Sequence, residues 1–267
     1  MLTSELFYLY SLYVPGTGCQ WRNLPHDLPK DGIIRYYINK WTEDGTIVMI
    51  HAYVLAETRQ AQERDVEPTA CIIDSQTVKT AAGVGERGYD GGKNMKGRKR
   101  HSAVDTQGNV LDVVVSPANI TDAEGGTYSL GNIAYRHPRV VKSWADRAYI
   151  GIIDDMRELY DIELEIVTQI TDQHTFIPLP RRWVVERSLA WLANYRRLAK
   201  EYERRPEISE SYVLLASIHV MLRRLKPDES REKAWMSRKR DRKGSPSVFS
   251  IHSSRNSLVS RWAASLK

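Results

Sequence analysis

The chain has 267 residues, 42% hydrophobic and 27% charged, which is enough for one large globular domain with an appendage. Its two cysteines, Cys19 and Cys71, lie far apart without metal-ligand spacing, which excludes a disulfide framework and indicates a reducing compartment. No apolar run is long enough to span a bilayer, and the apolar start lacks the features of a signal peptide. We therefore expect a cytoplasmic protein with no membrane partner.

The positive charge is concentrated near the end of the chain. The net charge is +6 and the pI about 9.2, values that suggest a nucleic-acid partner. Residues 226–267, however, hold 11 Lys and Arg against 4 Asp and Glu, a net charge of +7. The rest of the chain is close to neutral, so local clusters must carry the nucleic-acid argument there.

Residues 1–60 are predicted to be helical and interrupted. Apolar positions recur at helical spacing over 33–41, and a further helix is expected over 47–58. This region fits a small DNA-binding domain or a plain packing domain, and the spacing does not separate the two. Residues 61–68 read as a polar linker that ends at Pro68.

Strands dominate the next part of the chain. They are expected over 69–74, 98–105 and 110–115, the last two forming a hairpin, with a glycine-rich loop over 82–96. A helix from 121, a strand over 140–145, a helix over 150–160 and a strand over 162–168 follow. Two helices, 181–204 and 208–225, complete the pattern. This order predicts an α/β fold with a mixed sheet flanked by helices.

The last 40 residues differ in composition. Ten of residues 228–267 are serine, and basic residues are frequent while apolar ones are scattered. Such a segment buries too little surface to offset its ordering entropy, so we expect a mostly disordered tail.

Three carboxylates are candidates for chemistry. Asp74 ends the first strand and Asp146 the fourth, while Glu186 stands on the long helix among small residues. Strands that run in the same direction bring their carboxyl ends together, so Asp74 and Asp146 are expected to be neighbours. A carboxylate that caps a strand end and faces water is the alternative for Asp74. Asp105 and Asp112 are competing acids, expected at the surface.

Three such acids would suit hard divalent cations. Mg²⁺ takes oxygen ligands and leaves positions open for phosphate and water. Two ions about 3.5–4 Å apart can hold the attacking and leaving oxygens of a phosphoryl displacement. Basic clusters over 87–101 and 181–205 could supply affinity for a phosphate chain, although each cluster alone could be a solvated face.

Five motifs together resemble the bacterial insertion-sequence transposases of the DDE type. They are GCQWRNLPHDLP (18–29), IDSQTVKT (73–80), RGYDGGKNMKGRKRHSAVDTQGNVL (87–111), SWADRAYIG (143–151) and RRWVVERSLAWLANYRRLAKEYE (181–203). The resemblance covers about residues 5–225 and implies a ribonuclease-H-like catalytic domain, here 69–227. It implies that Asp74, Asp146 and Glu186 are the catalytic acids and the metal ligands. Arg182 matches the arginine of the family's Tyr, Arg, Glu, Lys signature, but Leu179 and Ala193 replace its tyrosine and lysine.

The resemblance also implies the reaction and the partners. We expect metal-dependent DNA cleavage and strand transfer, with two Mg²⁺ ions per site for which Mn²⁺ can substitute. The partners would be double-stranded DNA, as terminal inverted repeats and target, and a second copy of the chain in a homodimer at the nucleoid. Residues 1–60 would be a shortened DNA-binding region. The expected DNA contacts are Lys79, Arg98, Lys99, Arg100, Arg182, Arg196 and Arg197.

Two other functions stay open from the sequence. One is a nuclease of the same fold without strand transfer, and the other is an inactive DNA-binding remnant, which the shortened N-terminal region favours.

Overall fold

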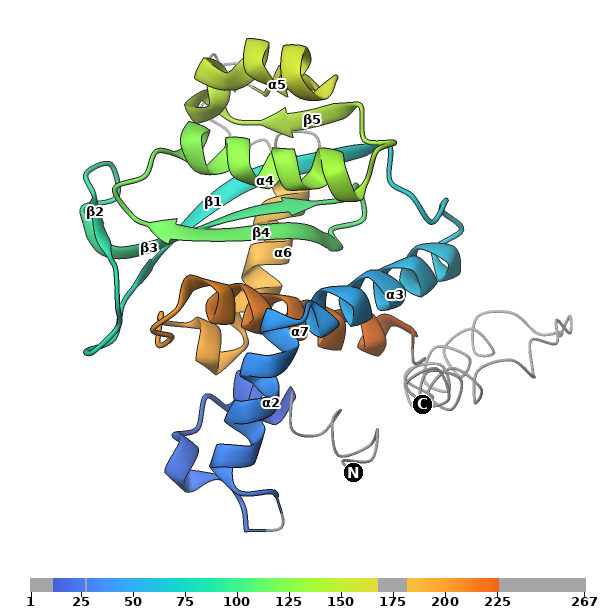
Figure 1. Ribbon diagram of the computed structural model, residues 1–267. Helices are drawn as coiled ribbons and strands as arrows, with labels where there is room; N and C mark the ends of the chain where they lie inside the picture. The colour runs from blue at the N-terminus through green and yellow to red at the C-terminus, as the bar shows by residue number, and fades with distance from the viewer. Residues whose placement is uncertain (1–11, 27, 168–181, 226–267) are drawn as a thin grey trace, which may run out of the picture. The chain divides into compact units, whose positions relative to one another are not determined.

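The computed structural model describes residues 12–26, 28–167 and 182–225, all of which belong to one compact unit (Figure 1). The predicted tail lies outside these residues. No helix in the described part of the chain is long and apolar enough to cross a membrane. The helices are η1 (Trp21–Asn23), α2 (Asp31–Glu43), α3 (Thr46–Ala61), α4 (Asp122–Arg136), η2 (Arg147–Ile152), α5 (Ile153–Tyr160), α6 (Arg182–Ala193), η3 (Arg196–Leu198) and α7 (Pro206–Leu225).

A six-stranded mixed sheet forms the centre of the unit. Its strands are β1 (Ala70–Lys79), β2 (Gly88–Asp90), β3 (Met95–Val104), β4 (Val110–Pro117), β5 (Lys142–Ala145) and β6 (Glu163–Ile166). They are ordered β2-β3-β1-β5-β6, with β4 also paired to β3. The β3 strand runs antiparallel to β1, whereas β5 runs parallel to β1 and β6 parallel to β5. This arrangement confirms the predicted ribonuclease-H-like α/β fold.

Helices cover both faces of the sheet (Figure 1). The odd-numbered side chains of β3 project to the face of the sheet that α4 covers, because the ring of His101 lies against the backbone of Gly125 in α4. The even-numbered side chains of β3 project to the opposite face, because Arg100 donates to the carbonyl of Leu198 in η3 at 2.8 Å. The alternation of a strand therefore divides the charges of β3 between two sides of the sheet.

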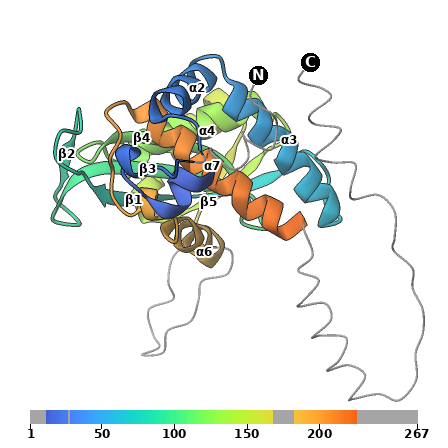
Figure 2. The same ribbon diagram turned by 90° about the horizontal axis from the view of Figure 1, so that it is seen from below.

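The N-terminal helices pack on α7. Figure 2 shows α7 passing between α6 on one side and α2 and α3 on the other, and all three helices contact it. Buried Ile47, Ile50, Val54 and Leu55 supply the apolar face of α3. The division of the chain at the predicted linker, 61–68, stays a prediction.

The helix predicted over 181–204 is shorter than expected. It ends at Ala193, and residues 199–203 run beside the end of β1, where the amide of Glu201 donates to the carbonyl of Lys79 at 2.9 Å. The guanidinium of Arg98 then binds the carbonyls of Glu203 and Arg204 at 2.9 and 2.8 Å. Helical geometry would withdraw these backbone groups from β1 and β3, so the strand contacts prevail over the helical periodicity.

The competing acids Asp105 and Asp112 are buried, so the prediction that they lie at the surface was wrong. Asp105 is fully buried and is paired with Arg59 of α3. It also accepts the amides of Gln107 and Asn109, both at 2.9 Å, which fixes the β3–β4 turn. Asp112 pairs with Arg136 of α4 at 2.7 Å. Both acids therefore serve the fold.

We predict that Glu210 makes the stability of the protein decrease as the pH rises from acidic to neutral values. Burial raises the pKa of this α7 carboxyl to about 7, although the amide of Val115 donates to it at 2.8 Å. The carboxyl of the unfolded chain titrates near 4.5, so the protonated form stabilises the fold and this contribution is lost as the pH rises from about 4.5 to about 7. Glu210→Gln should raise the free energy of unfolding by about 3 kcal/mol at pH 8, since one pKa unit corresponds to about 1.4 kcal/mol.

Urea denaturation at pH 5 and pH 8 measures this effect. The exposed Glu158 of α5, which is not among the groups that act on Glu210, gives the matched control, and Glu158→Gln should show the same pH slope as the unaltered protein. Equal pH slopes for Glu210→Gln and the unaltered protein would contradict the assignment.

Candidate active site

Asp74 and Asp146 come together at the carboxyl ends of two adjacent parallel strands. The β1–β5 register pairs Ala70 with Lys142 and Ile72 with Trp144. Continued by two residues, the same register sets Asp74 opposite Asp146. Asp74 accepts the amide of Ser75 at 2.7 Å, and Asp146 caps η2 by accepting the amide of Ala148 at 2.9 Å. The predicted strand 69–74 in fact continues to Lys79, so Asp74 lies within β1 where its pairing with β5 has already stopped.

Asp74 belongs to the face of the sheet that α6 covers. Asp74 is directly opposite Ser102 of β3, and cross-strand partners project to the same side. Ser102 shares its face with Arg100, which reaches η3 on the α6 side. The α6 helix itself contacts β1 and β3. The third predicted acid therefore stands on a helix that packs on the correct side of the sheet.

Glu186 lies on the exposed side of α6. Val185 and Leu189 are buried, as the predicted apolar stripe requires, whereas Glu186, Ala190 and Ala193 are exposed. The structure thus brings two of the three predicted acids together and leaves Glu186 on the same side of the sheet. Within the described ranges, no group of three or more His, Cys, Asp or Glu side chains is arranged to hold a metal ion.

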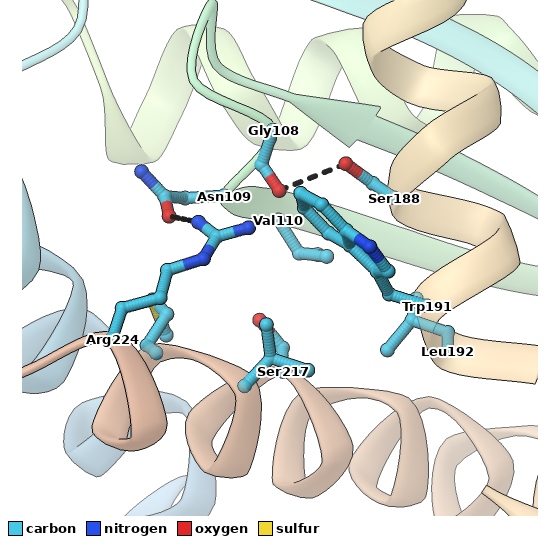
Figure 3. Close-up of a pocket in the computed structure, with 10 residues that line it drawn as sticks. Gly108, Asn109, Val110, Ser188, Trp191, Leu192, Ser217 and Arg224 are labelled. Atoms are coloured by element: carbon cyan, nitrogen blue, oxygen red, sulfur yellow. Dashed lines mark hydrogen bonds between the residues drawn. The ribbon is translucent and has the colours of Figure 1, made fainter. Parts of the chain in front are cut away.

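The position of α6 is fixed at the β3–β4 turn. Ser188 donates to the carbonyl of Gly108 at 2.9 Å (Figure 3). Arg187 donates to the carbonyl of Gln107 at 3.1 Å. Gly108 has a φ of +83°, and a Cβ there would lie 2.6 Å from Ser188 Oγ, so this close contact requires glycine. These bonds set the height of α6 along the sheet.

A small pocket lies beside this contact. Figure 3 shows it between the β3–β4 turn, α6 and α7, with Trp191 and Arg224 on its walls. The guanidinium of Arg224 stacks on Trp191 at 4.6 Å from the ring centroid and donates to Asn109. Neither Asp74 nor Asp146 lines this pocket, so it belongs to the packing of α6 and α7.

Tyr149 is buried in η2, three residues after Asp146. Burial, and then the negative charges of Asp74, Asp122 and Asp146, raise the pKa of Tyr149, an effect that the Ser75 side chain opposes. The phenol is therefore neutral, and both predicted acids are near enough to act on it. The α4 backbone adjoins its ring, because a Cβ at Gly126 would lie 2.5 Å from Tyr149 Cε1.

Two of the arginines expected to contact DNA lie in the interior instead. Arg98 is fully buried and Arg100 is 4% exposed. Arg98 binds three backbone carbonyls, and Arg100 binds the carbonyl of Leu198 and the carboxylate of Glu201 at 3.2 Å. A guanidinium so placed serves to hold the segment after α6, so neither residue is retained as a DNA contact.

Lys99 is enclosed on the other face of β3. Its ammonium pairs with Asp122 at 2.8 Å, donates to the carbonyl of Ile120 at 2.9 Å and lies 3.8 Å from Asp90. The prediction placed it on DNA, but the structure places it between β3 and the start of α4, with its side chain 9% exposed. Its donors are used within the protein.

The remaining expected contacts differ in exposure. Lys79 and Arg196 are exposed. Arg197 is held by Glu203 at 2.6 Å and lies over the rings of Trp21, Tyr202 and Tyr212, so it is largely enclosed. Arg182 begins α6, and its side chain lies outside the described atoms.

One exposed cation that contacts β1 was missed by sequence reasoning. Lys93, in the loop between β2 and β3, is exposed and places Nζ 3.2 Å from the carbonyl oxygen of Ser75. Ser75 is the neighbour of Asp74. The glycine-rich composition of this segment concealed both β2 and the return of the loop toward β1. The only signal in the sequence was a lysine within the basic run.

Comparison with known proteins supports the interpretation of these motifs. The family described as "Transposase DDE domain" matches residues 66–221. A protein of Burkholderia cepacia, named provisionally as a transposase for insertion sequence element IS402, is 32% identical over 129 residues. That alignment covers 45% of this chain and 60% of the relative, so the chain spans less than two thirds of the relative's length.

We predict that Gly126→Ala destabilises the protein. The added methyl group would lie 2.5 and 2.8 Å from two ring carbons of Tyr149 and would displace the ring. Overpacking of this kind costs about 1–3 kcal/mol, which exceeds the gain of up to about 1 kcal/mol in helix propensity. Urea denaturation measures the difference. Gly32→Ala in α2, where nothing lies within 4 Å of the new atom, should not destabilise. An unchanged stability of Gly126→Ala would show that the ring has room to move.

Proposed function

Because the chain belongs to the family of proteins with a transposase DDE domain, we propose that it cleaves DNA and joins the freed strand to a target. The reaction would be a metal-dependent phosphodiester cleavage at the end of an insertion sequence. Strand transfer would follow, by attack of the freed 3′ hydroxyl on target DNA. The observation that supports this most directly is the β1–β5 register, which, continued by two residues, brings Asp74 opposite Asp146.

Two of the three acids offer the kind of ligand that a hard divalent cation prefers. Asp74 and Asp146 offer carboxylate oxygens at one edge of the sheet, and such oxygens are the ligands that Mg²⁺ prefers. We propose Glu186 as the third ligand, from α6 on the same face. Two Mg²⁺ ions, or Mn²⁺ in their place, would supply charge for the attacking and leaving oxygens. The protein's own part is to position these oxygens through the β-sheet register and the anchored α6.

DNA contacts are proposed for the exposed cations at the end of β1 and after α6. Lys79, at the end of β1, and Arg196, after α6, are exposed and carry positive charge. Arg182 is retained from the family signature. Such contacts would give affinity that is independent of sequence and decreases with salt. We further propose that residues 1–60 contribute to DNA binding and that the chain acts as a homodimer on terminal repeats and target DNA at the nucleoid.

We predict that Asp74→Ala and Asp146→Asn each lower the cleavage rate by about a thousandfold or more, because each removes an acid that acts as part of one unit. The assay uses the full chain, a labelled duplex containing either flank of its coding region, a supercoiled target plasmid and MgCl₂. Joined products identify a strand transferase, and cut products alone identify a nuclease. The matched control is Asp155→Asn, an exposed acid of α5, which should cleave normally. Full activity of Asp74→Ala would overturn the assignment of the acids.

We predict that chelation abolishes cleavage while leaving DNA binding intact. Excess EDTA removes the divalent ions that the carboxylates would bind, whereas the contacts of lysine and arginine with DNA phosphates persist. Adding back Mg²⁺ or Mn²⁺ should restore the products, and Ca²⁺ provides a comparison of a larger ion. A gel-shift titration and the cleavage assay on the same samples separate the two effects. Cleavage that persists in EDTA would refute the metal-dependent mechanism.

A further inference from the structure

The segment between α6 and α7, residues 194–205, lies on the face of the sheet to which Asp74 projects. Arg98 and Arg100 of β3 project to this face, and their guanidinium groups bind the segment. Arg98 donates to two of its backbone carbonyls at 2.9 and 2.8 Å, and Arg100 donates to a third at 2.8 Å. The cross-strand partner of Arg100 is Gln76, two residues or about 7 Å along β1 from Asp74. Both arginines are buried, so the path of the segment beside the first acid is fixed from within the protein.

Exposure alternates in the middle of this segment. The exposed side chains are those of Lys200, Tyr202 and Arg204. The side chains between them, Glu201 and Glu203, are only 1% and 14% exposed. Residue 201 forms a parallel bridge with the end of β1, and an extended chain turns successive side chains to opposite sides. The alternation therefore separates these residues by charge, with the cations and the tyrosine outside and the two acids inside.

The two inward acids are neutralised inside the protein. Glu201 pairs with Arg100 at 3.2 Å and accepts the hydroxyl of Ser209 at 2.6 Å. Glu203 pairs with Arg197 at 2.6 Å. Both carboxylates are thus used by internal cations, and the outer side of the segment keeps a net positive charge.

The cations on the outer side have no acidic partner in the described part of the chain. No carboxylate there pairs with Arg196, Lys200 or Arg204, all of which are exposed. Arg205, which follows, is paired with two carboxylates at 2.8 and 3.5 Å and is left out. Lys200 and Arg204 are up to about 13 Å apart along an extended chain, and one strand of a duplex presents a phosphate about every 3.4 Å of its axis. The two cations can therefore reach different phosphates of the same duplex.

We propose that the outer side of the segment binds the phosphate backbone of duplex DNA, through Arg196, Lys200, Tyr202 and Arg204. This role rests on the proposed function and specifies where the duplex lies, which is over the segment between α6 and α7 on the side of Asp74. The cations would bind phosphate oxygens by charge, and the tyrosine would bind them through its hydroxyl. The buried arginines of β3 hold the backbone of this surface before DNA binds, which lowers the entropic cost of binding.

The affinity of the full chain for labelled duplex DNA, measured by fluorescence anisotropy in EDTA at several salt concentrations, tests the proposal. Lys200→Gln and Arg204→Gln should each reduce the slope of log affinity against log salt concentration by about one, and the double variant by about two. The melting temperature should not change, because neither side chain has an ion-pair partner to lose. Lys200→Arg and Arg204→Lys keep the charge and should keep the slope. Since phosphate contacts carry no sequence information, the loss should be equal for a duplex from the flank of the coding region and for an unrelated duplex.

Arg157→Gln is the matched control, because Arg157 is an exposed cation of α5, a helix that contacts α4. Its salt slope should equal that of the unaltered protein. An unchanged slope for the double variant of Lys200 and Arg204 would overturn the proposal. A lower melting temperature, with a slope that the charge-keeping variants do not restore, would also overturn it and assign the two side chains to the fold. If the unaltered chain binds neither duplex, the proposed function itself is refuted.

Discussion

The candidate site depends on β1 being longer than the strand beside it. β1 pairs with β3 from Ile72 to Lys79, whereas its pairing with β5 ends at Ile72. Asp74 therefore lies in a rigid strand that is supported on one edge and not paired to β5 on the other. Asp146 follows β5 at the corresponding height and begins η2. A carboxylate buried between two strands would be costly to ionise, but one at the end of a strand pair can stay charged and reach a ligand.

Charged residues inside β3 stabilise the surroundings of this site. Successive residues Arg98, Lys99 and Arg100 point alternately to opposite faces, and each finds partners there. The arginines bind carbonyls of the segment between α6 and α7, while Lys99 binds the start of α4. Unpaired burial of such cations would cost several kcal/mol each, so these contacts are required for the strand to be central. The same segment follows α6 and thereby restricts where Glu186 can lie.

The sequence predicted the fold class, the order of the strands and helices along the chain apart from β2, and the neighbouring strand ends of Asp74 and Asp146, because these follow from local alternation and from parallel pairing. It did not predict the burial of Arg98, Lys99 and Arg100, since a run of cations reads as a solvated surface until the strand is known to be central. It also extended α6 too far, because helical periodicity over 194–204 is a weaker determinant than backbone pairing with the end of β1. The loop position of Lys93 depends on one buried acid, Asp90, whose partners are distant in sequence.

The electrostatics near Tyr149 indicate why a cation would suit this edge of the sheet. Asp74, Asp122 and Asp146 all act on the same buried phenol, and their negative charges raise its pKa after the effect of burial. Lys99 and Lys93 offset this charge on the α4 side, where both lower the pKa of Asp122 against the effect of burial. Asp74 projects to the opposite face, and the β1–β5 register, continued two residues past its last pair, sets it opposite Asp146. Like charges on neighbouring strand ends repel, so a bound divalent ion between these carboxylates would relieve an unfavourable interaction.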